Sequence, residues 1–140
     1  MNNVDDKHPV DIRGMTPYHI AIRSNQLILS RFIMKTLDDK NPMYPNHPRG
    51  SYTFLHVAAI NGYLDMCELL IDNTEDKNPM DNLGWTPLHF AAREGHFEIC
   101  QLIARPLKDK NPITNDGTTP KQLMNTHIRN LNKNANKLFQ

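Results

Sequence analysis

The apolar residues of this chain cluster in pairs of short segments separated by one turn-forming residue. In residues 97–104 they recur at a mixed spacing of three and four, which is a helical period, and residues 87–94 contain two adjacent alanines. Gly95 lies between the two segments, and glycine can adopt the left-handed backbone that ends a helix. Thr86 suits an N-cap, and Pro87 suits the first helical position. The pattern predicts a helix, a tight turn and a second helix.

The same pattern returns along the chain in a nearly constant phase. The tetrapeptide Asp-Lys-Asn-Pro occupies 39–42, 76–79 and 109–112, at steps of 37 and 33 residues, and Asp-Lys-His-Pro occupies 6–9. The threonine before each pair recurs at steps of 37, 33 and 33 residues, as Thr16, Thr53, Thr86 and Thr119. The longer step places four extra residues within 44–50. Because two short helices cannot bury their apolar faces alone, this period predicts stacked units that share a continuous core.

The expected fold is all-α: a helix-turn-helix repeat solenoid of about three and a half to four units, joined by hairpin-like loops. The spacing divides the chain into units at 10–42, 43–79 with the insertion, 80–112, and 113–140 as a C-terminal capping unit with a polar tail. Residues 1–9 are interpreted as the remnant of a preceding unit or an N-terminal arm. We expect the chain to derive from a longer array.

Residues 86–96, Thr-Pro-Leu-His-Phe-Ala-Ala-Arg-Glu-Gly-His, resemble the central signature of ankyrin repeats. Residues 53–62 are similar, and residues 16–22 are a weaker copy in which Asn25 stands where the glycine belongs. Asparagine tolerates the left-handed backbone, so the same turn is expected there. The resemblance covers about residues 10–128 and implies a curved stack whose concave face and loop tips bind other proteins.

The chain departs from the family pattern at the insertion within 44–50, at the ends of the second helices and in the last unit. The glycine that usually follows the second helix is replaced by Leu37, Thr74 and Leu107. The sequence therefore does not determine the residue at which that helix ends. The fourth unit has Gln122 for the histidine and Ile128 for the glycine, as expected of a terminal cap. Residues after 128 are expected to form a polar helix or a fraying tail.

Composition narrows the function classes. The formal charge is +1 and the mean hydropathy is −0.60, so the whole chain has no strong preference for nucleic acid or membrane. No apolar run approaches the roughly 20 residues of a membrane span, and the polar N-terminal stretch does not resemble a signal peptide. Two cysteines make no disulfide framework. We expect an intracellular, monomeric protein of the cytoplasm, with the nucleus as an open alternative.

The histidines and cysteines are candidates for metal binding or catalysis, but their positions favour structural roles. His19, His56 and His89 share one repeat position, and the resemblance implies that this histidine bonds loop backbone. Equivalent positions in such a stack lie about 10 Å apart, too far to share an ion or form a disulfide. The same holds for Cys67 and Cys100, which are expected to be buried. Without a catalytic motif, we expect no enzyme activity, metal, cofactor or small-molecule substrate.

The resemblance places the binding surface residue by residue. The expected partner-binding residues are Trp85, Tyr52, Arg93, Glu94, Met80, Asn82, Leu83, Arg13, Met15, Arg23 and Arg49. Further positions on the concave side or the loops are Ile12, Ser24, Tyr44, His47, Ile60, Asn61 and Thr118. Trp85 is the single tryptophan, and Trp, Tyr and Arg are enriched at binding hot spots. The alternative role of Trp85 is to pack on its own loop.

Three further hypotheses remain open at this point. The chain could be a structural spacer or the capping fragment of a larger array without a partner of its own. The basic C-terminal stretch, with Lys121, Arg129, Lys133 and Lys137, could contact nucleic acid, although no base-stacking platform accompanies it. The resemblance also makes Asn78 and Asn111 candidates for asparaginyl hydroxylation, with a turn hydrogen bond as the simpler role.

Overall fold

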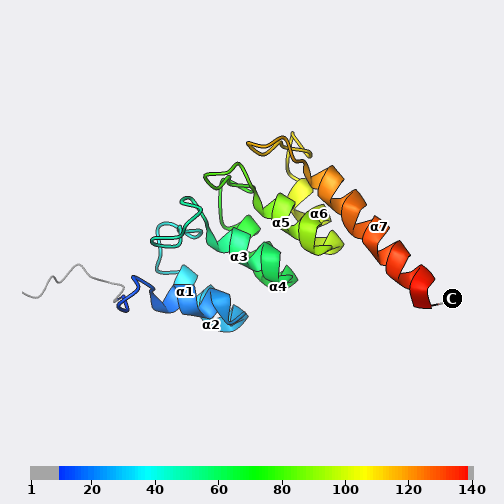
Figure 1. The fold of residues 1–140 in the computed structure, drawn as a ribbon. Coiled ribbons are helices and arrows are strands. Elements are labelled where there is room, and N and C mark those ends of the chain that lie inside the picture. Colours follow the sequence, from blue (N-terminus) through cyan, green and yellow to red (C-terminus); the bar gives the residue numbers. More distant parts are fainter. Residues whose placement is uncertain (1–9, 139–140) are drawn as a thin grey trace, which may run out of the picture.

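The computed structural model describes residues 10–138, and these fold into seven α-helices without a strand. The first six helices form three pairs that lie side by side in chain order, with the connecting loops along one edge (Figure 1). The expected all-α repeat solenoid is confirmed. The elements are α1 (Pro17–Arg23), α2 (Leu27–Met34), α3 (Phe54–Asn61), α4 (Leu64–Asp72), α5 (Pro87–Glu94), α6 (Phe97–Ala104) and α7 (Pro120–Leu138).

Each pair begins at a threonine whose backbone is extended and whose side chain caps the helix. In α5, Thr86 Oγ1 accepts a hydrogen bond from the backbone N–H of His89, and His89 Nδ1 accepts one from the N–H of Thr86 at 3.1 Å. The same reciprocal pair, a capping box, begins α1 and α3. Because these N–H groups are satisfied within the unit, the start of each pair is determined locally.

One residue with a left-handed backbone joins the two helices of each pair. Gly62 and Gly95 have φ of 75° and 77°, and Asn25 takes the same role with φ of 53°, as its sequence position predicts. The corresponding position 128 carries isoleucine, whose Cβ disfavours this backbone. α7 therefore runs through Ile128 without a break, and residues 129–138 are helix instead of a fraying tail.

A lysine of the Asp-Lys-Asn-Pro motif caps the second helix of each pair, where the family's glycine is missing. Lys110 Nζ donates to the carbonyl oxygen of Ala104 at 2.6 Å and to that of Leu107 at 3.0 Å. Lys40 and Lys77 make the corresponding bonds after α2 and α4. An ammonium group at a helix C-terminus satisfies unpaired carbonyls and complements the helix dipole.

The asparagine of the same motif holds the first turn of the next unit. Asn78 Oδ1 accepts a hydrogen bond from the backbone N–H of Leu88 at 3.1 Å, and Asn41 and Asn111 make the equivalent bonds at 2.9 and 3.1 Å. The motif therefore connects the end of one helix pair to the start of the next. From the sequence, the motif marks the period and its asparagines are expected to make a turn hydrogen bond, but this link between units is not predicted.

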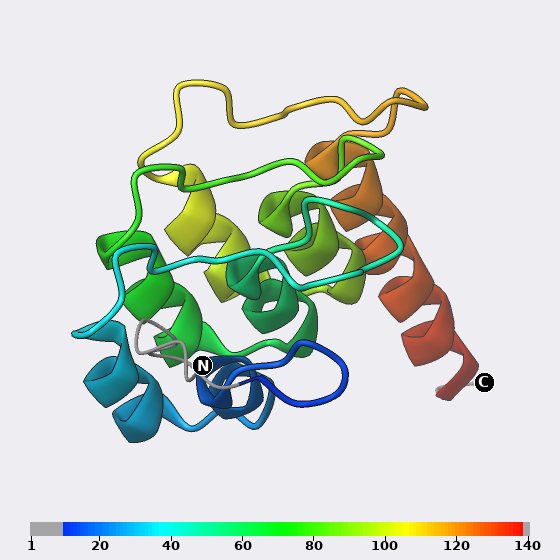
Figure 2. The same ribbon diagram turned by 90° about the vertical axis from the view of Figure 1, so that its left-hand side faces the viewer.

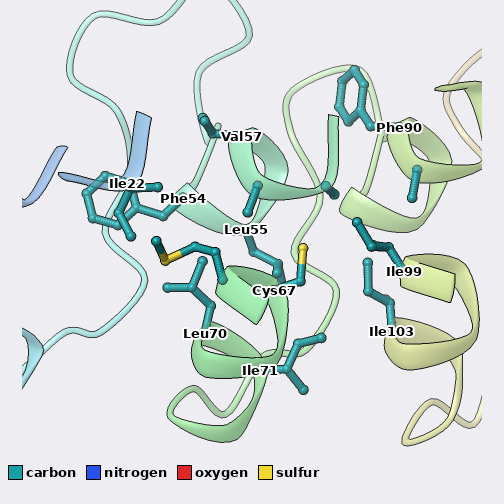
Figure 3. Close-up of a cluster of buried hydrophobic side chains, with 14 of the residues drawn as sticks. Ile22, Phe54, Leu55, Val57, Cys67, Leu70, Ile71, Phe90, Ile99 and Ile103 are labelled. Atoms are coloured by element: carbon teal, nitrogen blue, oxygen red, sulfur yellow. The ribbon is translucent and has the colours of Figure 1, made fainter. Parts of the chain in front are cut away.

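The core extends through the whole stack between the two rows of helices. Leu55, Leu70 and Ile103 are fully buried and come from three different helices (Figure 3). Ala58 and Ala91 are also fully buried, and their small side chains let neighbouring first helices approach closely. Deleting one large side chain from such a core typically costs about 2–5 kcal/mol.

The two cysteines belong to this core and are free thiols, as expected. Burial raises the pKa of the Cys67 thiol to about 12 and that of the Cys100 thiol to about 11. Both therefore stay protonated and unreactive near neutral pH. Ser30 holds the equivalent position in α2, where its hydroxyl is fully buried and has no hydrogen-bond partner in the described part of the chain.

Candidate protein-binding surface

The three repeat histidines brace the stack. His56 Nδ1 accepts the backbone N–H of Thr53 at 3.0 Å, so the ring proton is on Nε2, which donates to the carbonyl of Trp85 in the next unit at 3.1 Å. His89 repeats this arrangement with the carbonyl of Thr118. His19 accepts the N–H of Thr16 in the same way, but its Nε2 lies 3.5 Å from the carbonyl of Met43 instead of that of the residue before the next repeat threonine. Burial lowers the pKa of His56 to about 4 and lowers the pKa of the other two. These imidazoles are neutral structural donors, which is the role implied by the family resemblance.

A buried carboxylate organises the loop that leads to Trp85. Asp81 Oδ1 accepts the backbone N–H groups of Leu83 and Trp85, each at 2.9 Å. Asp81 Oδ2 pairs with Arg49 Nη1 at 3.0 Å, and the side chain of Asp81 is fully buried while that of Arg49 is 29% exposed. Arg49 belongs to the inserted loop of the second unit, so this ion pair joins two units.

Trp85 lies at the centre of an aromatic and cationic cluster. The guanidinium carbons of Arg49 and Arg93 lie 5.5 and 5.4 Å from the centre of the Trp85 ring system. They also lie 5.2 and 5.1 Å from the ring centre of Phe90. Arg93 Nε donates to Glu94 Oε1 at 2.8 Å. Trp85 is half-buried and packs on Phe90, so it combines a structural role with an exposed edge. We call Arg49, Trp85, Phe90 and Arg93 the Trp85 cluster.

Three residues expected to face a partner are buried instead. Met15, Tyr44 and Tyr52 are only 8%, 8% and 7% exposed, so the placement expected for their side chains is corrected. The Tyr52 ring is stacked between those of His47, at 4.0 Å, and His56, at 4.9 Å. His47 belongs to the insertion, which folds back over the tyrosine. The repeat pattern does not determine the path of an inserted loop. The sequence therefore does not predict that His47 covers Tyr52.

Beside the Trp85 cluster, the first two units enclose a hollow of about 450 Å³. It is lined by Arg23, Tyr44, His47, Tyr52, Val57, Ile60 and Asn61. Most of these were expected at the surface from their repeat positions, and the structure brings them together at one place. Val57 was missed, although it lies one turn before Ile60 and Asn61 on the same face of α3. Burial lowers the pKa of His47, and Arg49 adds to this effect, so the imidazole stays neutral near neutral pH.

The loop tips form a continuous edge beside this surface. The expected loop-tip residues are exposed: Arg13, Met80, Asn82 and Leu83. Asn82 also ties adjacent loops together, because its N–H donates to the carbonyl of Arg49 at 2.9 Å and its carbonyl accepts from Asn115 Nδ2 at 3.1 Å. These loops run side by side along the stack (Figure 2).

One exposed apolar residue per unit follows the motif proline. These residues are Val10, Met43, Met80 and Ile113, with exposed fractions of 57%, 58%, 59% and 64%. Of these four, only Met80 is among the partner-binding residues expected from the sequence. The repeat phase could have identified the other three, since all four occupy the same position of the unit.

The remaining sequence hypotheses concern modification, metal binding and membranes. Asn78 and Asn111 use their amide oxygens as helix caps, and their hydroxylation stays a prediction. Within residues 10–138, no three His, Cys, Asp or Glu side chains are grouped as a metal site requires. Among the helices of the same range, none combines the length and apolar character needed to cross a bilayer.

Comparison with known families agrees with this architecture. The family model for ankyrin repeats (3 copies) matches residues 1–81 and 32–116, which is most of the chain. No curated protein matches the sequence. Ankyrin repeats are generally protein–protein interaction modules and are generally non-catalytic. With its stacked helix pairs, histidine braces and matching family model, the chain belongs to the ankyrin repeat family.

Proposed function

We propose that this protein is a non-catalytic scaffold or adaptor that binds a partner protein through the hollow and the adjoining Trp85 cluster. The observation that carries this proposal is the hollow itself, which combines apolar and aromatic walls with a cationic rim. Val57, Ile60 and Tyr52 supply the walls, and Arg23 lies exposed at the rim. Such a mixture of apolar surface and a few polar groups is typical of binding sites.

The charges on this surface favour a partner segment that carries a carboxylate beside an apolar side chain. Asp81 and Glu94 are paired with Arg49 and Arg93, whereas Arg23 has no ion pair among the described residues. Bidentate Arg–carboxylate bonds are among the stronger polar contacts of interfaces. The exposed apolar residues of the loop tips extend the available surface toward the edge of the stack.

An affinity pull-down from the native cell tests this proposal. The wild type is compared with Arg23→Glu, which reverses the charge at the hollow, and with Arg31→Glu, which makes the same change at an exposed position of α2 away from it. Partners held by the wild type and by Arg31→Glu, but lost with Arg23→Glu, support the hollow as the site. Circular dichroism confirms that all three proteins are folded.

The variant Trp85→Ala is a second test of the site. It is expected to weaken partner binding by about 2 kcal/mol or more. Because Trp85 also packs on Phe90, the unfolding free energy is measured beside the affinity. Equal partner retention by the wild type and Arg23→Glu would move the site to the loop tips. Failure of the wild type to retain any partner would favour a structural spacer.

A further inference from the structure

A second, larger recess lies at the opposite end of the stack, between α6 and α7. Its volume is about 680 Å³. Phe97, Cys100 and Ala104 of α6 line one side, and Pro120, Met124 and Ile128 of α7 line the other. The α6 residues are spaced three and four positions apart, and the α7 residues are spaced four positions apart. Each set therefore forms one apolar stripe along its helix. The recess is therefore an apolar groove parallel to two helices.

The groove lies where the row of second helices ends. α1, α3, α5 and α7 pack in one row, and α2, α4 and α6 pack in another. α7 contacts α5 extensively and α6 only slightly, and it continues past the ends of both (Figure 1). Within the described residues, no helix follows α6 in its row.

The repeat shows what kind of surface the groove continues. Cys67 and Ile71 of α4 correspond to Cys100 and Ala104 of α6, and they are 0% and 5% exposed because α6 packs beside α4. Ala104 is only partly buried, and Ile128 and Leu131 of α7 are 41% and 51% exposed. Cys100 is 3% exposed and forms the floor of the groove, whereas Phe97 and Ala104 on either side of it are only partly buried. The apolar stripe of α6 is thus partly uncovered, and among the described residues no helix follows α6 in its row to cover it.

The charged residues that line the groove are both basic, and no acidic residue of the described part of the chain lines it. α7 contains no acidic residue. Lys110 and Lys121 line the groove directly. Electrostatic complementarity selects an acidic partner and accelerates its association.

We propose that this groove binds an acidic amphipathic helix of a partner protein, in the place that a further second helix of the stack would occupy. α4 and α6 are 9 and 8 residues long, so about two to three turns of helix fill the groove. The apolar stripe of the partner helix contacts Phe97, Met124 and Ile128, and its carboxylates lie beside Lys110 and Lys121. The groove is separate from the hollow between the first two units, so either proposal stands without the other.

The chain itself supplies a suitable probe. Residues 63–73 contain α4, which occupies the second-helix row and carries Asp65, Glu68 and Asp72 without any basic residue. A helix-stapled peptide of this sequence, with alanine at Cys67 to prevent oxidation, is titrated into the isotope-labelled full chain. We expect saturable chemical-shift changes confined to α6 and α7. A peptide with lysine at the three acidic positions should bind about 10-fold more weakly or worse.

Two matched variants locate the site. Ile128→Glu, at an exposed position of the groove, should weaken binding of the acidic peptide at least about 10-fold. Ile28→Glu makes the same change on α2, where the isoleucine is 86% exposed, and should leave the affinity unchanged. Lys121→Glu tests the charge separately and should weaken the acidic peptide while improving binding of the lysine-bearing peptide.

Three results would overturn the proposal. The first is an absence of shifts in α6 and α7 at millimolar peptide, and the second is equal affinity for the acidic and lysine-bearing peptides. The third is concentration-dependent dimerisation of the chain alone that Ile128→Glu abolishes, because a second copy would then occupy the groove.

Discussion

Arg49 Nη1 lies 3.0 Å from Asp81 Oδ2, and this contact joins the inserted loop of one unit to the fully buried carboxylate of the next. The insertion is therefore part of the packing between units. The same arginine covers the rings of Trp85 and Phe90, so the candidate binding surface and the interface between units share a side chain.

Arg49→Ala is expected to lower the free energy of unfolding by about 1–3 kcal/mol, because it leaves a buried carboxylate without its cation. Urea denaturation measures this change. Arg13→Ala is the control, since its ion pair with Asp11 is exposed and should contribute nothing measurable. Equal stability of Arg49→Ala and wild type would show that the pair is not a link between units.

The neutral histidines predict a loss of stability in mild acid. Folding lowers the pKa of His56 from 6.5 to about 4. Between these two values the imidazole is protonated in the unfolded chain but neutral in the folded protein. Its contribution is present above pH 6.5 and is lost as the pH falls toward 4, to a total of about 3 kcal/mol. His19 and His89 shift in the same direction and steepen the effect.

Urea unfolding at about pH 7 and about pH 5 tests this prediction, with His56→Gln as the matched variant. Glutamine suits this position because Gln122 Oε1 already accepts the N–H of Thr119 at 2.8 Å in the fourth unit. The variant should be less stable at neutral pH, since it loses the donor to Trp85, but its pH dependence should be shallower. An unchanged slope would assign the acid sensitivity to other groups.

Ser30→Cys is expected to stabilise the protein by about 1 kcal/mol, because it removes a buried hydroxyl without a hydrogen-bond partner. Cysteine already occupies this position in the second and third units, so the larger sulfur has a precedent in the same packing. Cys67→Ser is the reciprocal change and should destabilise by a similar amount. The melting temperatures of both variants test this prediction. A Ser30→Cys protein less stable than the wild type would show that the Ser30 hydroxyl makes a stabilising hydrogen bond.

Asn78→Ala is expected to cost about 1 kcal/mol, because it removes the side-chain cap from the N–H of Leu88. Asn132→Ala, at an exposed position of α7, is the control and should cause no loss, since alanine is a better helix former. If both variants have the stability of the wild type, the motif asparagine does not hold the next unit.

The parts of the fold that the sequence predicts are those determined by neighbours in the chain. Thr86 and His89, three residues apart, cap a helix that ends at Gly95, nine residues after Thr86. The same local logic explains why Asn25 forms the turn and why Ile128 does not.

The parts that it does not predict depend on how distant segments approach. The lysine caps require the loop after each second helix to fold back on itself. The burial of Tyr52 depends on where the insertion places His47. The groove between α6 and α7 arises because α7 follows the first-helix row, which no single residue of the sequence reveals.

The contacts that the repeat histidines make with the next unit differ in length. His56 and His89 donate to the carbonyl of the residue before the next repeat threonine, at 3.1 and 3.2 Å. His19 Nε2 instead lies 3.5 Å from the carbonyl of Met43, at the other end of the inserted loop. In a linear array each unit contacts only its neighbours, so the weakest contact decides where the array opens.

The first unit also exposes apolar side chains that later units bury. Leu29 and Phe32 are 47% and 68% exposed, while the corresponding Met66 and Leu69 are 0% and 8% exposed. The amide hydrogens of α1 and α2 should consequently exchange with solvent before those of α3 to α6. We therefore expect the stack to open in one direction, with its first pair of helices unfolding while the later pairs remain folded.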